Sequence, residues 1–494
     1  MQHPKKGIDQ RLRAAADLVL RTLADKEAPL VADVGCDHGY LTAYLLRQRP
    51  DLSVIASDIS GPSLAKARLL LDPGIYGSRV KFREADGLSA LEDGEKPDCV
   101  VMAGMGGRLI LDMLQKGRQK LGGALLVLQA NTDVPLLRSG LSGMGLQIRE
   151  EAYAEVKGRQ YVIFLCEEGE RRELSAEESL LGAQQEAGMS EGRRRYLTGL
   201  LAKRRQEQRL ACVKRTPKSL EKTAEIAAEI EMISEELGMK DCTVSELREL
   251  VGRLAPYETA EEWDNVGLLV GRRMAPVRAA LIALDLTPEV IREAKELGCA
   301  AIITHHPLMF HAVQRITDET REGELILQLA ASGLSHIAAH TNLDRAPGGV
   351  NDTLIAAAGV HDVRGEGFIR VGDLEREMRF GELCERIRET LGAQIRTYGS
   401  PDKPVHVLGC CSGAGGSDYR EAMELGADCF LTGEIRQHEA LDAVFDGCPV
   451  IEAGHYETER PVCAALRDAL QKEADALQYK MTFFCSGVDP FERG

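Results

Sequence analysis

Two separate runs of alternating strand and helix patterns constrain this chain more than any other feature of its sequence. Short β-branched apolar runs alternate with helical patterns from residue 29 to about residue 165, and the alternation resumes after residue 244. Such alternation is typical of α/β sheets with parallel strands. At roughly 150 residues per domain, 494 residues also leave room for about three domains. We therefore expect two α/β cores in one chain.

The predicted strands of both runs are short and apolar. In the first run they are Leu30–Val34, Ser53–Ser57, Val80–Glu84, Cys99–Ala103, Ala124–Gln129 and Gln160–Cys166. In the second run they are Val277–Leu284, Ala300–Thr304, Ser335–His340, Val405–Cys410, Cys429–Thr432, Val450–Ala453 and Tyr479–Phe484. The polar residues that follow these strands are the candidates for binding and chemistry, because α/β sheets bind ligands beyond the carboxyl ends of their strands.

A strongly basic segment separates the two runs. Residues 193–222 hold 11 Lys and Arg against two acidic residues, Glu207 and Glu221. Apolar residues recur there at helical spacing, and Pro217 can begin a helix but cannot sit inside one. This pattern predicts two helices packed antiparallel as a hairpin with a basic face. We therefore divide the chain into domains at 1–166, 167–240 and 241–494.

The formal net charge of −16 hides a division between the two halves of the chain. Residues 1–240 hold 36 Lys and Arg against 35 Asp and Glu, whereas residues 241–494 hold 25 against 42. Nine of the 11 histidines also follow residue 240. The acidic average would exclude nucleic acid as a partner, but the nearly neutral first half with its basic hairpin does not. Two different chemistries are therefore expected in one chain.

The cysteines and the N-terminus indicate the compartment. None of the 13 cysteines forms a Cys-x-x-Cys pair, and we interpret them as buried free thiols in a reducing cytosol. Residues 1–13 are polar and lack the apolar core of a signal peptide. No stretch approaches the roughly 20 apolar residues that span a bilayer. The sequence predicts a cytoplasmic protein without a membrane partner.

A glycine-bearing turn and acidic strand ends indicate a nucleotide-type cofactor in the first half. The turn holds Gly35 and Gly39, where a missing Cβ lets the backbone approach a ligand. Such a turn by itself is more often a simple helix entry, but three acids end successive strands: Asp33, Asp58 and Asp86. An acid at the end of the second strand can bind both hydroxyls of a ribose. Asp37 stands where a dinucleotide site would have a glycine, which favours the cationic S-adenosylmethionine.

The first half resembles the bacterial tRNA (adenine-22-N1)-methyltransferases over about residues 1–236. The matching motifs are Asp33-Val-Gly-Cys-Asp-His-Gly-Tyr-Leu41, Asp86-Gly-Leu88, Ala103-Gly-Met-Gly-Gly107 and Leu128-Gln-Ala-Asn131. The resemblance implies a Rossmann-like class I methyltransferase fold followed by a helical hairpin. It implies a cofactor pocket built from Asp33, Gly35, Asp37, Gly39, Asp58, Asp86 and Gly87, with Gly104 and Met105 facing the flipped base. The family usually has proline where this chain has Ala130, which affects the rigidity of that loop more than the chemistry.

Methyl transfer to adenine N1 needs little acid–base help, because N1 already carries a nucleophilic lone pair. The enzyme must extrude the base from the tRNA fold and position it. Asn131 is the candidate for holding the Watson–Crick edge, although a strand-end Asn that caps a turn fits the pattern equally well. The candidate contacts to tRNA phosphates are Arg204, Arg205, Arg209, Lys214 and Arg215 of the hairpin. The alternative for the hairpin is a solvated charge run.

Histidines and carboxylates follow three predicted strands of the second half. They are His305 and His306, then His340 and Asp344, then His455 and Glu459. Imidazole and carboxylate suit Zn²⁺, Fe²⁺ or Mn²⁺, and five ligands with one bridging carboxylate are enough for two ions. A lone histidine is more often a core residue than a ligand. Three strand ends with the same ligand types favour a dinuclear metal site.

Residues 244–494 resemble the NIF3-like dinuclear metal proteins, a family also named GTP cyclohydrolase 1 type 2 homologues. The matching motifs are Glu262-Trp-Asp-Asn-Val-Gly-Leu-Leu-Val-Gly271, Thr304-His-His-Pro307, His340-Thr-Asn-Leu-Asp344, Cys411-Ser-Gly-Ala-Gly-Gly-Ser417, Thr432-Gly-Glu434 and Gly454-His-Tyr-Glu-Thr-Glu459. The resemblance implies an α/β metal domain in which His306 and Asp344 hold one ion, His305 and His455 hold the other, and Glu459 bridges them. It also implies a homo-oligomer, a ring-shaped hexamer with the metals facing an internal cavity.

Further residues near these motifs have two interpretations each. His340, Glu434 and His438 are candidates for supporting the ligands or carrying protons. The turn at residues 412–417 either cradles phosphate or is a tight strand-to-helix connection. Trp263 is expected to be a packing anchor and not a substrate platform.

These observations predict a bifunctional protein. The first half is expected to methylate adenine N1 in tRNA with S-adenosyl-L-methionine. The second half is expected to be a metal-dependent, hydrolase-like module with two divalent ions and an unassigned substrate, for which a nucleotide is one candidate. The alternatives are that the second half is a non-catalytic metal-binding oligomerisation scaffold, or that the first half only binds S-adenosylmethionine.

Overall fold

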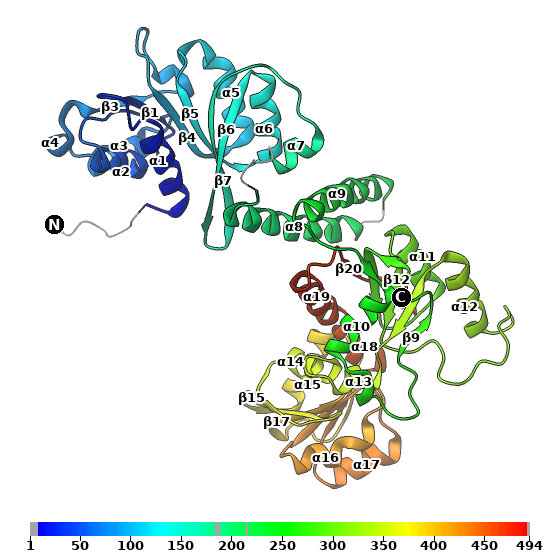
Figure 1. Cartoon of the computed structure of the whole chain (residues 1–494). Coiled ribbons are helices and arrows are strands. Elements are labelled where there is room, and N and C mark those ends of the chain that lie inside the picture. The colour runs from blue at the N-terminus through cyan, green and yellow to red at the C-terminus, as the bar shows by residue number, and fades with distance from the viewer. Residues whose placement is uncertain (1–7, 183–187, 214–215, 492–494) are drawn as a thin grey trace. The chain divides into compact units, whose positions relative to one another are not determined.

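The computed structural model describes residues 8–182, 188–213 and 216–491, which form two compact units (Figure 1). The first unit extends to Gln208 and includes Lys222–Leu237, and the second holds Arg209–Glu221 and the chain from Gly238 onward. Each unit buries hydrophobic cores of its own. Within the described ranges, no helix combines the length and the apolar character that crossing a membrane requires.

A seven-stranded sheet forms the centre of the first unit. In sheet order its strands are β3 (Val80–Glu84), β2 (Ser53–Asp58), β1 (Leu30–Val34), β4 (Cys99–Gly106), β5 (Leu125–Thr132), β7 (Arg159–Glu168) and β6 (Leu146–Val156). Strands β1 to β5 are parallel, and β7 is antiparallel to both of its neighbours. The strand order reverses between β1 and β4, so the carboxyl end of these strands is the switch point at which such sheets bind ligands.

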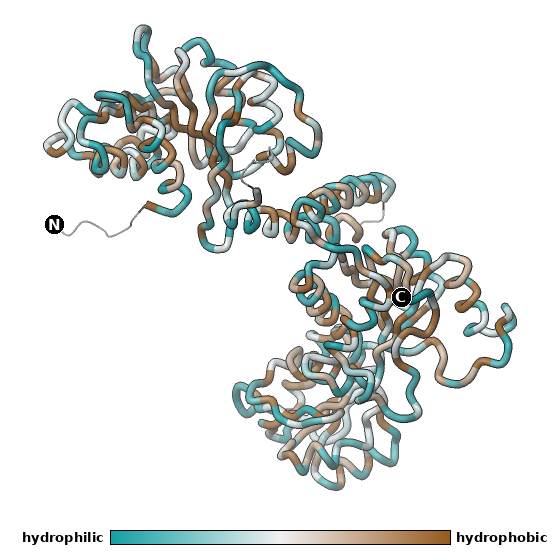
Figure 2. The backbone as a smooth tube through the Cα atoms, in the orientation of Figure 1, coloured by the Kyte–Doolittle hydropathy of each residue, from teal (hydrophilic) through white to brown (hydrophobic). Residues whose placement is uncertain are grey.

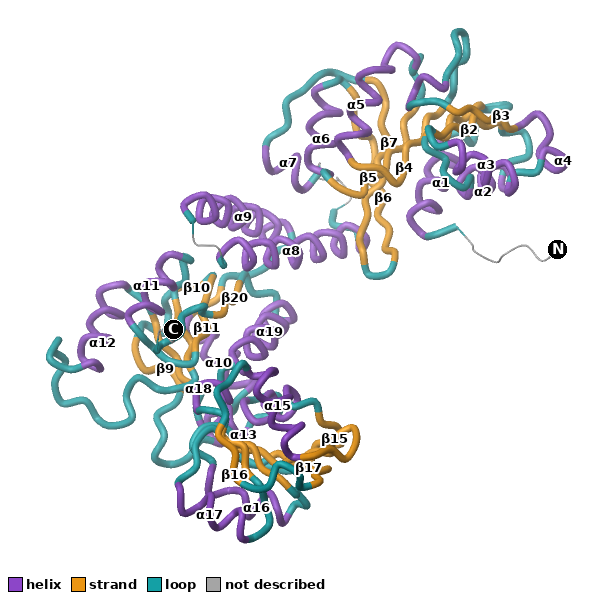
Figure 3. The backbone as a smooth tube through the Cα atoms, turned by 180° about the vertical axis from the view of Figure 1, so that it is seen from behind, coloured by secondary structure: helices purple, strands orange, loops and turns teal. Residues whose placement is uncertain are grey.

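Helices cover both faces of this sheet. They are α1 (Gln10–Thr22), α2 (Tyr40–Gln48), α3 (Gly61–Leu70), the short α4 (Pro73–Tyr76), α5 (Gly107–Gly117), α6 (Val134–Gly143) and α7 (Ala176–Leu181). Apolar residues of α1, α2 and α3 share one buried core with the strands. Figure 3 shows these helices on one face of the sheet and α5 to α7 on the other. This layered arrangement is the predicted Rossmann-like fold.

Helices α8 (Glu191–Cys212) and α9 (Pro217–Glu236) form the predicted hairpin. Pro217 is the first residue of α9, as its missing N–H and fixed φ predict. Ion pairs join the two helices, with Arg193 Nη2 lying 2.9 Å from Glu236 Oε1. The seam between the helices is therefore partly polar, and the last turn of α8 already belongs to the second unit.

The second unit contains two larger sheets and one two-stranded sheet. The five-stranded sheet consists of β20 (Thr482–Cys485), β11 (Ala279–Ala283), β12 (Ala301–Thr304), β13 (Ser335–Ala338) and β9 (Gly267–Val270). The six-stranded sheet consists of β14 (Val360–Arg364), β15 (Arg370–Arg379), β17 (Pro404–Cys411), β18 (Cys429–Thr432), β19 (Val450–Glu452) and β16 (Arg396–Tyr398). The small sheet pairs β8 (Cys242–Thr243) with β10 (Pro276–Val277).

Parallel strands in both larger sheets place their carboxyl ends at the candidate metal ligands. β11, β12 and β13 are parallel in one sheet, and β17, β18 and β19 are parallel in the other. The helices are α10 (Val244–Leu254), α11 (Pro288–Glu296), α12 (Arg321–Ser332), α13 (Thr341–Arg345), α14 (Val350–Ala357), α15 (Phe380–Leu391), α16 (Tyr419–Glu424), α17 (Gln437–Phe445), α18 (His455–Glu459) and α19 (Pro461–Ala476). Figure 2 shows hydrophobic residues concentrated along the sheets and hydrophilic ones along the outer loops.

The predicted α/β class of both halves is confirmed, and most predicted strands match within a few residues. The predicted strand Val277–Leu284 is in fact two strands, β10 and β11. Strands β6, β8, β9, β14, β15 and β16 were not predicted. All of these except β15, which is second from an edge, form the edge of a sheet, where a strand needs less apolar surface.

Candidate cofactor pocket and metal centre

A cavity of about 510 Å³ lies at the carboxyl ends of β1 to β4 in the first unit. Six of the predicted cofactor residues line it: Asp33, Gly35, Asp37, Asp58, Asp86 and Gly87. The predicted catalytic residues Gly104, Met105 and Asn131 line the same cavity. Gly39 lies behind the wall, where it is the N-cap of α2 and approaches Ala67.

Buried and hydrogen-bonded carboxyls form the acidic wall of this cavity. Asp33 is only 3 % exposed, and its Oδ2 accepts a hydrogen bond from Thr42 Oγ1 at 2.5 Å. Burial raises the pKa of Asp33 to about 6, although the Thr42 hydroxyl opposes the shift. Asp58 Oδ2 accepts from the Asp37 amide at 2.9 Å, and Asp58 Oδ1 accepts from the Ser60 amide at 2.8 Å. An acidic wall with ordered carboxylates fits a ligand that carries both ribose hydroxyls and a positive charge.

Gly35 and Met105 bring two of the sequence motifs together inside the cavity. Gly35 has a φ of 75°, which side chains rarely adopt. A Cβ at this position would also collide with the terminal methyl group of Met105. The backbone conformation therefore requires the glycine, and the Met105 side chain at the end of β4 lies close to it.

The last residues of β4 are held by side chains from β5 and α1. The Gly104 amide donates to Gln129 Oε1 at 3.0 Å, and the Gly104 carbonyl accepts from Asn131 Nδ2 at 2.8 Å. Arg11 Nη1 donates to Gln129 Oε1 at 2.9 Å and to Asn131 Oδ1 at 3.2 Å. Sequence patterns did not identify Arg11, because nothing in them places the start of α1 beside the end of β5. The sequence could have identified Gln129 as a site residue, because it ends a predicted strand.

Two of the hairpin cations predicted to contact tRNA are enclosed by the first unit. Arg204 Nη1 pairs with Glu207 Oε2 at 2.6 Å, and its Nε pairs with Glu229. Arg205 is 2 % exposed. The partly polar seam between α8 and α9 draws these side chains inward, which the count of basic residues alone could not reveal.

The remaining predicted tRNA contacts lie elsewhere. Arg209, in the last turn of α8, donates to the Phe483 carbonyl at 3.0 Å and to Gln471 Oε1 at 2.9 Å within the second unit. Lys214 and Arg215 lie outside the described residues. The exposed cations of α8 are Arg194, Arg195 and Lys203.

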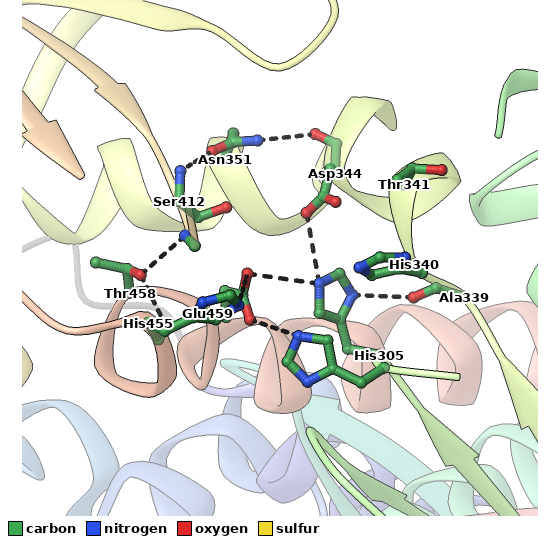
Figure 4. Close-up of polar contacts among 12 residues, drawn as sticks. His305, Ala339, His340, Thr341, Asp344, Asn351, Ser412, His455, Thr458 and Glu459 are labelled. Atoms are coloured by element: carbon green, nitrogen blue, oxygen red, sulfur yellow. Dashed lines mark hydrogen bonds and ion pairs between the residues drawn. The ribbon is translucent and has the colours of Figure 1, made fainter. Parts of the chain in front are cut away.

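The second unit brings four histidines and two carboxylates to one place (Figure 4). His305 and His306 follow β12, and His340 follows β13. Asp344 lies on α13, and α18 begins with His455 and ends with Glu459. Figure 4 shows His305 directed at both Asp344 and Glu459. All five predicted metal ligands and His340 are therefore neighbours.

Each of the four histidine rings is held by a hydrogen bond at its Nδ1 atom. The bonds join His305 to the Ala339 carbonyl at 3.0 Å, His306 to Asp285 at 2.9 Å, His340 to Asp264 at 3.0 Å and His455 to Glu434 at 2.9 Å. All four partner atoms are acceptors, so in the neutral form of each ring the hydrogen is on Nδ1 and the lone pair is on Nε2. Metal-binding histidines are typically oriented in this way.

The sequence identified only part of this supporting layer. Glu434, one of the predicted supporting residues, contacts the candidate ligand His455. Asp264 and Asp285 were missed, although Asp285 follows β11 in the same way as the candidate ligands follow β12. His438 is exposed on α17, and none of the cluster's contacts among the described residues involves it.

Distances divide the ligand atoms into two groups around Glu459. His306 Nε2 lies 3.1 Å from Glu459 Oε2, and His455 Nε2 lies 3.2 Å from Glu459 Oε1. His305 Nε2 lies 3.6 Å from Asp344 Oδ1 and 3.8 Å from Glu459 Oε1. Glu459 Oε1 thus lies near both His305 and His455, as in the pairing that the resemblance implies, whereas Asp344 lies nearer to His305. The division of the ligands between two ions stays a prediction.

The buried atoms of this cluster fit divalent cations. His305 Nε2, Asp344 Oδ1 and Glu459 Oε2 are buried and, among the described residues, lack a hydrogen bond of good geometry. Unsatisfied buried polar atoms are costly, and cations between them would satisfy all three. Although burial opposes it, hydrogen bonds to Asp285 and Glu459 raise the pKa of His306 to about 10. The cluster therefore favours positive charge at its centre.

Aromatic residues surround the entrance to the metal centre. A cavity of about 1050 Å³ adjoins it and is lined by His306, His455, Phe310 and Tyr456, among others. Trp263 is 61 % exposed, and its ring centroid lies 6.0 Å from that of His340. The expectation that Trp263 is a packing anchor is therefore wrong, because the loop that carries it lies on the surface beside the site.

The turn at residues 412–417 uses its first amides internally. The Ser412 amide donates to Asn351 Oδ1 at 2.8 Å, and the Gly413 amide donates to Thr458 Oγ1 at 3.2 Å. These amides are therefore not available to a phosphate. Of the two interpretations of this turn, the tight strand-to-helix connection is favoured.

Comparisons with known proteins assign the second unit. The family model described as Duf34/NIF3 (NGG1p interacting factor 3) matches residues 242–490. A GTP cyclohydrolase 1 type 2 homolog from Clostridium acetobutylicum is 34 % identical over 262 residues, which cover 50 % of this chain and 98 % of that protein. A crystal structure of a Staphylococcus aureus hypothetical protein aligns with 27 % identity and a TM-score of 0.50, covering 52 % of this chain and all of that one.

The first unit matches a second family. The model described as tRNA (adenine(22)-N(1))-methyltransferase matches residues 31–239. The structure of the B. subtilis m1A22 tRNA methyltransferase aligns with 24 % identity and a TM-score of 0.40, covering 47 % of this chain and 98 % of that one. The chain is therefore a fusion whose second unit belongs to the Duf34/NIF3 family and whose first unit matches the tRNA (adenine(22)-N(1))-methyltransferase family model.

Proposed function

We propose that the first unit transfers a methyl group from S-adenosylmethionine to N1 of an adenine in tRNA. The observation that carries this proposal is the shared cavity, in which the acidic wall of Asp33 and Asp58 meets Gly104, Met105 and Asn131. The family match over residues 31–239 supports tRNA as the substrate.

The residues of the cavity fit this cofactor, which supplies an electrophilic methyl group when bound. Asp58 ends β2, where a carboxylate can bind the ribose hydroxyls. Asp33 provides a buried carboxylate, which favours the positive sulfonium. The NH₂ group of Asn131 provides a hydrogen-bond donor for the base. The protein's contribution is therefore to position N1, which needs neither an acid nor a base.

Product analysis tests this activity directly. The full-length protein is incubated with unmodified tRNA and labelled S-adenosylmethionine, and the digested tRNA is examined by mass spectrometry. We expect 1-methyladenine from the unaltered protein and none from the Asp58→Ala variant. Cofactor binding without any methylated product would favour the alternative that this unit only binds S-adenosylmethionine.

We place the tRNA phosphate contacts on the exposed cations Arg194, Arg195 and Lys203 of α8. Replacing all three with alanine should weaken tRNA binding and reduce the slope of log affinity against log salt by up to about 3. The matched control replaces the exposed Arg376, Arg379 and Arg388 of the second unit. Equal affinities for the two triple variants would refute this placement.

For the second unit we propose a site for two divalent ions, Zn²⁺, Fe²⁺ or Mn²⁺. The predicted ligands His305, His306, Asp344 and His455 would hold the ions, and Glu459 would lie between them. The observation that carries this proposal is the convergence of three Nε2 atoms on one buried carboxylate. Such ions, when bound, supply Lewis acidity and hydroxide near neutral pH. Asp264, Asp285 and Glu434 would keep the rings in the tautomer that binds metal.

The reaction proposed for this centre is a hydrolysis with an unassigned substrate. A nucleotide is a candidate, because Phe310 and Tyr456 give the adjoining cavity aromatic walls. The alternative is a scaffold that holds a homo-oligomer, a hexamer by resemblance. The full-length Glu459→Gln variant separates the two: loss of nucleotide turnover with an unchanged mass by light scattering favours an enzyme. Dissociation in the absence of any turnover favours a scaffold.

A further inference from the structure

The side chain of Arg11 reaches from the first turn of α1 to the carboxyl end of β5. Its Nη1 donates to Gln129 Oε1 and Asn131 Oδ1, at 2.9 and 3.2 Å, and its Nη2 lies 3.4 Å from Asp9 Oδ2. The guanidinium lies 5.6 Å from the centroid of the Tyr161 ring. The Arg11 side chain is 18 % exposed and lines the cofactor cavity. It is a cation inside the candidate active site, and neither the motifs nor the expected roles of the site residues include it.

Arg11 determines how two side-chain amides are turned. A guanidinium only donates hydrogen bonds, so the atoms that face it must be the oxygens of Gln129 and Asn131. Gln129 Nε2 also donates to Asn131 Oδ1, at 3.2 Å. The oxygen of Asn131 thus accepts two hydrogen bonds, which fills both of its lone pairs. Asn131 can therefore offer only its NH₂ group to other partners.

The oriented amides in turn hold the end of β4. Gln129 accepts from the Gly104 amide, and Asn131 donates to the Gly104 carbonyl. Gly104 has a φ of 86°, and a Cβ there would lie 3.3 Å from Arg11 Nη1. Both backbone polar groups of Gly104 thus depend on amides whose polarity Arg11 sets. Removing Arg11 would leave the two amide oxygens without their charged donor and would let either amide turn over.

We propose that Arg11 is a positioning residue for adenine methylation, which acts by keeping Asn131 a hydrogen-bond donor and the Gly104 backbone in one conformation. This inference rests on the methyltransferase function proposed above. Adenine N1 must keep its lone pair for the methyl group, so a donor at Asn131 has to bind another acceptor of the base. A reversed amide would instead offer an oxygen to the amino group of adenine and hold the base differently.

The positioning role predicts a loss in turnover and not in binding. Arg11→Met keeps the apolar stem of the side chain and removes its donors. We expect kcat to fall about 100-fold, because small misplacements cost that much, while KM for tRNA and Kd for S-adenosylmethionine change less than about threefold. Arg11→Lys should restore part of kcat, since an ammonium group can satisfy one oxygen but lacks the planar fork. Arg13→Ala is the matched control, an exposed arginine on the same helix.

A double-mutant cycle distinguishes action through Asn131 from direct contact with tRNA. If Arg11 acts through Asn131, adding Arg11→Met to Asn131→Ala should reduce kcat by less than about threefold further. If Arg11 binds a tRNA phosphate, the two effects multiply and KM rises in Arg11→Met. Thermal unfolding of each variant and its Kd for S-adenosylmethionine show whether the unit remains folded.

The outcomes separate this inference from the function on which it rests. A 100-fold loss in kcat with unchanged binding and a non-additive cycle supports the positioning role. Unchanged kcat in Arg11→Met, or a purely multiplicative cycle with raised KM, overturns it and leaves the methyltransferase proposal intact. Absence of 1-methyladenine with the unaltered protein overturns both.

Discussion

Asp33 is a buried carboxyl whose ionisation is linked to both folding and ligand binding. Its pKa is raised by burial from 3.8 to about 6, with the Thr42 hydroxyl opposing the shift. A group with a raised pKa in the folded state contributes stability below its unfolded pKa, and this contribution is lost as the pH rises through about 6. A cationic ligand favours the ionised carboxylate and reverses this effect.

We therefore predict that S-adenosylmethionine binds more weakly below about pH 6 than at pH 7.5, because the carboxyl is then protonated. Isothermal titration calorimetry between pH 5 and 8 measures the effect. The Asp33→Asn variant should bind more weakly than the unaltered protein at pH 7.5, approach its affinity near pH 5, and lose the pH dependence between these values. It should also stabilise the ligand-free protein near neutral pH, by at most about 3 kcal/mol. An affinity of the unaltered protein that is constant across pH 6 would contradict this account of Asp33.

Trp263 provides a signal from the metal centre, because it is the single tryptophan of the chain. Its ring lies 6.0 Å from that of His340. We predict that adding Fe²⁺ or Co²⁺ to metal-free protein quenches tryptophan fluorescence at saturation by about half or more, since paramagnetic ions quench nearby indoles. Trp263→Phe should remove the emission, and Glu459→Gln should keep the emission but remove the response. A metal response that persists in Glu459→Gln would place the ion elsewhere.

Single residues also show where sequence patterns stop being informative about the site. Strand-end positions predicted His305, His306 and His455 as neighbours, because parallel strands end at one edge of a sheet. The orientation of each ring depends on acceptors from other loops, such as Asp264, which lies far away in the sequence. Arg11 is the corresponding case in the first unit. Side-chain partners of this kind are set by the packing of loops, which periodicity does not encode.

At the scale of elements, the Arg138–Glu151 pair joins α6, β6 and α7. Arg138 is 1 % exposed, and its Nε donates to Glu151 Oε1 at 2.8 Å. Its Nη1 donates to the carbonyls of Ser179 and Leu180, at 3.0 and 2.7 Å. The guanidinium thus satisfies the end of one helix while it neutralises a carboxylate on the strand that forms the edge of the sheet.

Removing one partner of this pair should be costly, because the other charge stays buried. We predict that Arg138→Met lowers the free energy of unfolding of the first unit by about 3–5 kcal/mol. Arg138→Met combined with Glu151→Leu should recover part of this loss. Urea denaturation, followed by circular dichroism, measures both. If the single variant is as stable as the double variant, the ion pair does not contribute this free energy of unfolding.

The same region explains which elements could be predicted. Strand β6 was missed because Arg149, Glu150, Glu151 and Glu155 interrupt its apolar pattern. As an edge strand it keeps one side in contact with solvent and pairs with β7 through backbone hydrogen bonds. Internal strands such as β1 are apolar on both faces and were predicted to the residue. Similarly, the apolar periodicity of the hairpin predicted its two helices, but it could not predict that the Arg205 side chain is buried.

At the scale of the whole molecule, the two units differ in charge and in the kind of site they contain. The first combines an acidic cofactor cavity with exposed cations on α8, and the second concentrates histidines and carboxylates around one buried glutamate. The net charge of −16 describes neither unit. Each cavity is lined by residues of one unit alone. The chain therefore has two separate candidate sites, one in each unit.

Metal content per chain is the most direct measurement of this central claim. Elemental analysis by mass spectrometry is applied to the full-length protein, to Asp33→Ala, to His438→Ala and to Glu459→Gln, each loaded with the same divalent ion. The account predicts about two ions per chain in the first three proteins and close to none in Glu459→Gln. Metal retained in Glu459→Gln, or lost in Asp33→Ala, would contradict it.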